Sequence, residues 1–339
     1  MRILTMSIAF ILFTACTSNG KQEDDGEKQN NATQQTTSSK TLPSSSGAKS
    51  EVIVVCDDTI WDGRAGATIK RVLAKEQYGS RNEPFFELFQ LRKRDFKEML
   101  KRTRHLVHIE KGNTNVAEIK TDVYARPQNY VHIVYRDGEK LDSLVKSVIG
   151  KAFTSFRELD MTITRNKWKD RTWPSPKKMA KDGITFMLPK SFQTTVDKRN
   201  LVVGWAESKK ADLVMFVYTR PFTYDDQLTF QREDIIRWRD SISEIHIPAD
   251  REGSYTQTET DPAPEINVTK VGDYIGFETR GYFRAVGDFM GGSFINITLF
   301  DDANERIIMM DGLVYAPNQK KRSILMELEA MFRSVNIRR

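Results

Sequence analysis

The hydrophobic positions in the first part of the chain alternate between strand-like and helix-like spacing. Residues 52–55 are an unbroken apolar run, which indicates a strand buried on both faces. Residues 141–156 carry apolar side chains three and four apart, which predicts a long amphipathic helix. The same reasoning predicts further strands and short helices, the strands over 85–91, 106–109, 117–124 and 130–135 and the helices over 69–77 and 96–100. These elements predict an N-terminal α+β domain over residues 51–165.

A basic segment with two prolines separates this pattern from the next one. Residues 166–183 contain Trp173-Pro174-Ser175-Pro176, and both prolines disfavour a helix. We therefore interpret residues 166–183 as a linker between two domains.

The second pattern, over residues 184–339, is richer in strands. The alternation predicts strands over 184–188, 201–206, 212–218, 274–283, 294–300 and 306–315. One helix is expected over residues 232–244, and Asn318 is expected to cap a final helix with an apolar stripe from Ile324 to Val335. The fold class that follows is α+β. It has two mixed α/β halves, the second being a curled antiparallel sheet closed by a C-terminal helix.

Residues 1–16 have the pattern of a lipoprotein signal peptide. The apolar run over residues 3–13 is too short for a spanning helix, which needs about 20 apolar residues. Thr14 and Ala15 form a small-residue approach to Cys16, which resembles a bacterial lipobox. We predict Cys16 to be the site of lipid attachment, so that the membrane is a partner through this lipid.

Residues 17–50 are predicted to be a disordered polar tether. Their only aliphatic side chains are Ala32, Leu42 and Ala48, so they cannot bury enough apolar surface to offset the entropy of ordering. The acidic cluster over residues 21–27 is similar to export signals of some Gram-negative lipoproteins. We expect a lipid-anchored protein of the cell envelope, in the outer membrane, and leave its periplasmic or surface-exposed side open.

Charge and cysteine content narrow the possible partners. The chain carries a formal charge of +6, spread thinly along its length. Nucleic acid is not an expected partner of an exported protein, whereas another envelope protein or a glycan remains possible. Cys56 is the only cysteine besides Cys16. Because the Cys16 sulfur is expected to carry lipid, we expect no internal disulfide. Its neighbours Asp57 and Asp58 would raise its pKa, and we expect a buried, inert thiol.

Several short motifs resemble one family. They are Trp238-Arg239-Asp240-Ser241, Gly253-Ser254-Tyr255, Asp288-Phe289-Met290-Gly291-Gly292, Tyr315-Ala316-Pro317 and, in the first half, Leu42-Pro43-Ser44 and Trp61-Asp62-Gly63. On these the chain resembles the domain-of-unknown-function family 4837 from about Leu42 to Val335, and it departs from the pattern at Phe283 and Ser293. The resemblance implies an uncharacterised bacterial envelope lipoprotein, and it implies no chemistry.

No motif predicts a catalytic, cofactor-binding or metal-binding residue. Residues 63–68 lack the glycine pattern of a phosphate loop and are interpreted as a helix start, and Gly291-Gly292 as a hairpin turn. His105 and His108 are three apart on a predicted strand and therefore face opposite sides, while His132 and His246 stand alone in the sequence. Glu278 and Arg280 share one face of a strand and predict a surface ion pair.

These observations favour a non-enzymatic binding or assembly module of the cell envelope. A small-ligand or glycan carrier is the second hypothesis, and an unrecognised hydrolase is the third. An open apolar groove would favour the carrier, and convergent titratable groups in a deep pocket would favour the enzyme.

Overall fold

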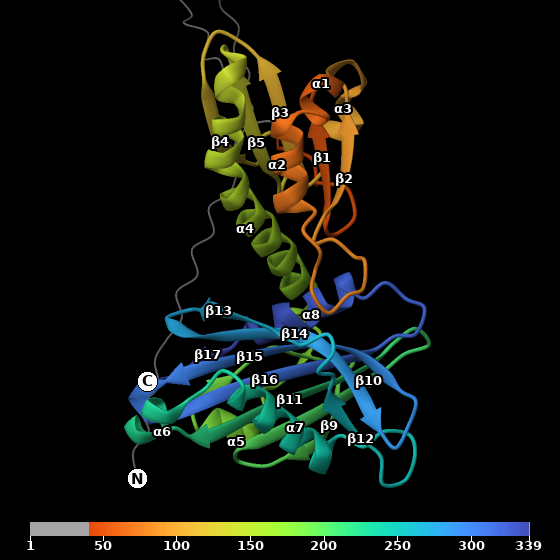
Figure 1. Cartoon of the computed structure of the whole chain (residues 1–339), viewed down its shortest axis with the longest axis vertical. Coiled ribbons are helices and arrows are strands. Elements are labelled where there is room, and N and C mark those ends of the chain that lie inside the picture. Colours follow the sequence, from red (N-terminus) through yellow and green to blue (C-terminus); the bar gives the residue numbers. More distant parts are fainter. Residues whose placement is uncertain (1–40, 339) are drawn as a thin grey trace, which may run out of the picture. The chain divides into compact units, whose positions relative to one another are not determined.

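The computed structural model describes residues 41–338, of which those from Leu42 onward belong to one compact unit (Figure 1). The predictions for the signal peptide, for Cys16 and for residues 17–40 of the tether lie outside the described residues.

The N-terminal half is built on a five-stranded sheet in the order β2-β1-β3-β5-β4. Its strands are β1 (Glu51–Val55), β2 (Glu87–Leu91), β3 (His105–Lys111), β4 (Val116–Thr121) and β5 (Asn129–Tyr135). β1, β2, β3 and β5 run parallel, and β4 is antiparallel to β5. A mostly parallel sheet needs cover on both faces, and this explains why β1 is apolar on every position after Glu51.

Helices cover one face of this sheet, and a segment with two single-turn helices covers the other. The helices of this half are α1 (Asp58–Trp61), α2 (Arg64–Leu73), η1 (Lys93–Asp95), α3 (Glu98–Lys101), η2 (Gly138–Lys140) and α4 (Leu141–Trp168). α2 and α4 lie along the same sheet (Figure 1), and Ile69 of α2 and Val145 of α4 pack with Val107 of β3. On the opposite face, Phe96 and Leu100 pack against a smaller apolar cluster that includes Leu106 and Tyr130 of the sheet.

The C-terminal half contains an eight-stranded antiparallel sheet. Its strands are β9 (Gln193–Asp197), β10 (Leu201–Glu207), β11 (Asp212–Pro221), β12 (Tyr255–Thr258), β13 (Glu265–Val271), β14 (Tyr274–Val286), β15 (Gly291–Asp301) and β16 (Arg306–Tyr315). The order is β12-β14-β15-β16-β11-β10-β9, and β13 also pairs with β14. The remaining elements are β6 (Thr172–Trp173), α5 (Lys177–Lys181), β7 (Ile184–Thr185), β8 (Leu188–Pro189), α6 (Tyr224–Thr229), α7 (Asp234–His246), η3 (Asp302–Asn304), α8 (Arg322–Phe332) and β17 (Asn336–Ile337).

The eight-stranded sheet lies between two helices. Leu325 and Leu328 of α8 pack on one face with Met310, while Ile235 and Ile242 of α7 pack in the apolar cluster of the other face. The predicted fold class is confirmed: the chain is α+β, and its second half is a curled antiparallel sheet closed by a C-terminal helix.

The described end of the tether differs from the prediction. Ser44 and Ser46 form β-bridges with Arg126 and Thr103, so pairing begins before Glu51. The Ser50 amide donates a hydrogen bond of 2.8 Å to the Asp160 carboxylate of α4. Residues 44–50 are ordered despite their short polar side chains, because their backbone forms hydrogen bonds with residues beside β3 and β5.

The predicted linker also differs, since much of it is regular structure. α4 continues to Trp168, and β6 pairs with β8. α5 begins directly after Pro176, a position where proline is tolerated because the first turn of a helix leaves its amides unpaired. The final helix begins later than predicted, after Lys321 instead of Asn318, which adopts a left-handed φ of 57°.

Candidate functional site

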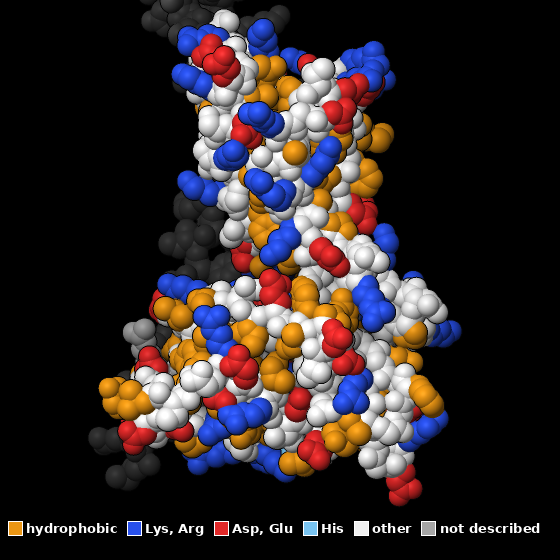
Figure 2. All heavy atoms as spheres, in the orientation of Figure 1, with side chains coloured by type: hydrophobic (Ala, Val, Ile, Leu, Met, Phe, Trp, Pro, Cys, Tyr) orange, Lys and Arg blue, Asp and Glu red, His pale blue; other side chains and the backbone are white. Residues whose placement is uncertain are grey.

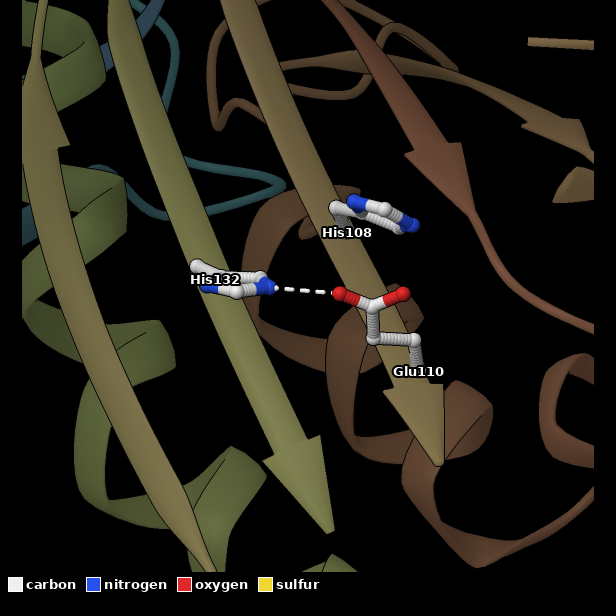
Figure 3. Close-up of side chains that lie close together, drawn as sticks. All are labelled: His108, Glu110 and His132. Carbon is white, nitrogen blue, oxygen red and sulfur yellow. Dashed lines mark hydrogen bonds and ion pairs between the residues drawn. The ribbon is translucent and has the colours of Figure 1, made fainter. Parts of the chain in front are cut away.

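Two histidines and a glutamate come together on the sheet of the N-terminal half. His108 of β3 is the direct register partner of His132 of β5, and Glu110 lies two positions after His108 on the same face (Figure 3). The ligand atoms of the three side chains all lie within 4.8 Å of one another. The prediction that His132 stands alone is therefore wrong in space, because strand pairing brings it to His108.

Each member of this cluster has further partners. His132 Nε2 lies 3.0 Å from Glu110 Oε1, and His108 Nδ1 lies 2.8 Å from the hydroxyl of Tyr130. Lys93 donates a hydrogen bond of 2.8 Å to Glu110 Oε2. His108 is buried, while His132 and Glu110 are partly open to solvent.

The surroundings set the protonation states of the cluster. Burial lowers the pKa of His108, so the neutral imidazole is favoured at pH 7. Hydrogen bonds from Lys93 and then from His132 lower the pKa of Glu110 to about 2, so this carboxyl is ionised. A neutral imidazole and a carboxylate can both donate an electron pair to a cation, through nitrogen and oxygen respectively.

His105 belongs to the opposite face, as the strand spacing predicts. Its ring stacks on Phe156 of α4 at 4.6 Å, and its Nε2 lies 3.2 Å from Asp160 Oδ1. Burial lowers the pKa of His105 despite this carboxylate. The Asp160 carboxylate also accepts hydrogen bonds from the Ser50 amide and the Arg104 guanidinium. Asp160 therefore links the segment before β1 to α4.

An aromatic cleft opens at one end of the C-terminal half. It has a volume of about 610 Å³ and is lined by Phe222, Gln227, Phe230, Asp273, Tyr274, Ile275, Phe300, Asp302 and Ala303. The ring of Phe230 lies 5.7 Å from Phe222 and 5.5 Å from Phe300. Tyr224 and Leu228 of α6, an element beside the cleft, are exposed. Figure 2 shows a hydrophobic patch at the lower left, where Figure 1 labels α6. None of the described lining residues is Lys, Arg or His.

The predicted surface pair Glu278–Arg280 belongs to a larger network, in which Arg280 is buried and Glu278 is partly buried. Arg280 donates hydrogen bonds to Glu278 at 2.7 Å and to Glu329 of α8 at 2.6 Å. Arg280 is only 4% exposed. Glu329 also accepts hydrogen bonds from Arg157 of α4 and Arg333. Burial alone would raise the pKa of Glu329, but these three arginines outweigh it and hold that pKa well below its usual range. Because α8 covers this face of β14, the prediction of an exposed pair was wrong.

The remaining predicted site residues fall as follows. Cys16 lies outside the described residues. Cys56 is buried, and burial, Asp57 and Asp58 raise its pKa to about 12. Gly63 is the N-cap of α2 and has the extended backbone that is usual there. The predicted turn at Gly291-Gly292 is displaced: the chain turns at Gly287, which has a positive φ, and Gly291 and Gly292 lie in β15.

The comparisons with protein families follow the two halves of the chain. The model of the domain of unknown function DUF4837 matches residues 173–334. This part of the chain is similar to the DUF4837 family. A second model, the domain of unknown function DUF8532, matches residues 45–169. The predicted resemblance is thus confirmed for the DUF4837 half. Trp61-Asp62-Gly63 lies within the range of the second model, and Leu42-Pro43-Ser44 lies just before it.

Solved structures and curated proteins add little to the family matches. A structure from Bacteroides thetaiotaomicron is 8% identical, with a TM-score of 0.26 and coverage of 46% of both chains. LpqN of Mycobacterium tuberculosis, described as involved in cell envelope biogenesis, is 9% identical with a TM-score of 0.29; the match covers 46% of this chain and 83% of LpqN. No curated protein matches the sequence. Within the described residues, no helix has the length and apolar character needed to cross a membrane.

Proposed function

We propose that the chain is a non-enzymatic binding module of the bacterial cell envelope, held at its membrane by lipid on Cys16, and that it binds a neutral glycan in the aromatic cleft of its DUF4837 half. The observation that carries the binding function is the cleft itself. Ligand sites are concave, largely apolar and about 300–1,000 Å³ in volume, with a few polar groups that orient the ligand. The cleft of about 610 Å³ meets this description.

The polar groups of the cleft select the chemistry of the ligand. Gln227, Asp273 and Asp302 supply carboxylate and amide oxygens, and the cationic residues that recognise anionic ligands do not occur among its described lining residues. A ligand rich in hydroxyl donors, with an apolar face for the rings of Phe230 and Phe300, suits this lining. A neutral sugar has both properties.

Binding to a panel of neutral oligosaccharides tests this proposal. Maltose, cellobiose, mannobiose and chitobiose series are titrated calorimetrically into the full chain. We expect one series to bind, and Phe230→Ala to weaken its binding by about 5-fold, because a ring–ligand contact contributes about 1 kcal/mol. Phe289→Ala is the matched control, since Phe289 is 93% exposed and does not line the cleft. Equal losses in both variants, or binding of anionic ligands alone, would overturn the proposal.

The anchor is tested separately. Cells that express the wild type or Cys16→Ser are labelled with a palmitate analogue. We expect label on the wild type only, because thioether lipidation needs the Cys16 sulfur. Equal label on both proteins would remove Cys16 as the attachment site without affecting the ligand experiment.

A further inference from the structure

We propose that His108, Glu110 and His132 form a binding site for a divalent transition-metal cation, and that Zn²⁺ is the cation their two nitrogens and one carboxylate suit. Zinc sites with an open position use three protein ligands of this kind, and two imidazoles with one carboxylate are a known combination. Mg²⁺ and Ca²⁺ prefer oxygen ligands throughout, so the two imidazoles favour a transition metal over them.

The unsatisfied nitrogen of His108 is the main observation behind this site. His108 is 7% exposed, and its Nε2 has no hydrogen-bond partner among the described residues. A buried polar atom without a partner is costly, and such atoms often mark a missing water or ion. One ring nitrogen of His108 belongs to the group of ligand atoms that lie within 4.8 Å of one another, together with a ring nitrogen of His132 and an oxygen of the Glu110 carboxylate.

The partners behind the three ligands are those that orient metal-binding side chains. Tyr130 lies 2.8 Å from His108 Nδ1; when this nitrogen carries the proton and donates to the hydroxyl, Nε2 keeps its lone pair for a cation. Glu118 Oε1 lies 3.8 Å from His132 Nδ1, on the side away from Glu110. A histidine whose second nitrogen faces a carboxylate or hydroxyl is the usual arrangement around zinc.

The geometry needs only small side-chain movements to receive the ion. Zinc bonds of about 2.0–2.2 Å place tetrahedral ligand atoms about 3.4 Å apart. Glu110 and His132 can adjust, because their side chains are 26% and 20% exposed. The same exposure gives the ion a path from solvent and leaves room for water as the fourth ligand.

A simple ion-pair network explains less of the cluster. Lys93 and His132 both contact Glu110, and such a network accounts for the carboxylate. It leaves His108 Nε2 buried without a partner, whereas a cation satisfies all three side chains. Lys93 does not block the site, because its side chain is 70% exposed and can turn to solvent.

Calorimetric titration of Zn²⁺ into the full chain, prepared without a polyhistidine tag, tests the site. We expect one Zn²⁺ per chain and no detectable binding of Mg²⁺. His132→Ala and Glu110→Gln should weaken Zn²⁺ binding by at least about 10-fold, and Tyr130→Phe by about 10-fold through loss of the partner of His108. His246→Ala is the matched control, since this histidine lies on α7 in the other half and should leave binding unchanged.

Co²⁺ provides a second readout that does not depend on affinity alone. Its visible absorption reports the ligands directly, so the spectrum of the wild type should change in His132→Ala and stay the same in His246→Ala. Circular dichroism establishes that each variant is folded; if His108→Ala fails to fold, the two partly exposed ligands decide. No Zn²⁺ binding by the wild type, or equal binding by the wild type, His132→Ala and Glu110→Gln, would overturn the proposal.

Discussion

Two buried ionisable groups, Glu329 in the C-terminal half and His108 in the N-terminal half, differ in how fully their polar atoms are paired. In the C-terminal half, both oxygens of Glu329 accept hydrogen bonds, one from Arg333 and the other from Arg157 and Arg280. In the N-terminal half, His108 has one ring nitrogen beside Tyr130 and the other without a partner among the described residues.

This difference separates groups that hold the fold from groups that point to a ligand. The Glu329 carboxylate is neutralised where it lies, and it joins α4, β14 and α8. Such a group is costly to break but has nothing left to offer a ligand. His108 Nε2 has no partner among the described residues, and His108 lies beside Glu110 and His132, so the proposed ion would complete this cluster.

Removal of the Glu329 carboxylate should have the largest effect on stability. Glu329→Ala leaves Arg157 and Arg280 buried without their shared counter-ion, and we expect a loss of about 3–5 kcal/mol in the free energy of unfolding. Urea denaturation measures this loss. Glu327→Ala is the matched control on the same helix, where the pair with Lys49 is 42% exposed at the glutamate and should cost less than about 1 kcal/mol. Equal costs would show that the buried network does not hold the halves.

The pH dependence of this network should be nearly as large. The pKa of Glu329 is depressed in the folded state, while its unfolded value is about 4.3. The stability from its charge is therefore fully present above about pH 5 and is lost as pH falls below it. The difference between wild type and Glu329→Gln in urea denaturation should shrink from pH 7 to pH 3. A constant difference would contradict an ionised Glu329.

The order of elements could be largely predicted from the sequence, but the buried charges could not. In the sequence, the apolar stripe of α4 ends at Phe156. The buried face of the helix continues with Arg157 and Asp160, which are charged. Charged residues are usually exposed, so they conceal an inward face unless the partner helix is known. Glu278 and Arg280 were rightly placed on one face, yet only the position of α8 decides that this face is buried.

The histidine cluster was missed for a related reason. Spacing along one strand separates His105 from His108, but strand order brings His132 to His108. One signal was present: Val107-His108-Ile109 and Val131-His132-Ile133 repeat the same three residues in two predicted strands. Two adjacent parallel strands in register would place these histidines side by side. Neither segment alone, however, determines which strand becomes its neighbour in the sheet.

A smaller effect is expected where the N-terminal half meets the start of α8. Glu83 accepts hydrogen bonds from the amides of Lys321 at 2.7 Å and Arg322 at 3.1 Å. A carboxylate at a helix N-terminus contributes about 0.3–1 kcal/mol, so Glu83→Gln should lower the free energy of unfolding by that amount. Glu98→Gln, at a side chain that is 90% exposed, should leave it unchanged within error. No difference between the two variants would mean that α8 does not depend on this contact.

The last test concerns the reactivity of Cys56 and not the stability of the fold, and it asks whether this buried thiol of the N-terminal half stays protonated. Burial, then Asp57 and Asp58, raise the pKa of this thiol to about 12. The thiolate is the reactive form, and three pKa units lower its fraction at pH 8 by about 1,000-fold. In Cys16→Ser, Cys56 is the only thiol, and iodoacetamide should modify the native protein far more slowly than the protein in guanidinium. The native rate should keep rising with pH above about 10, where a free thiol has levelled off. A native rate that levels off near pH 10 would mean that the thiol is shielded only sterically and has an ordinary pKa, and the comparison with His108 would then rest on geometry alone.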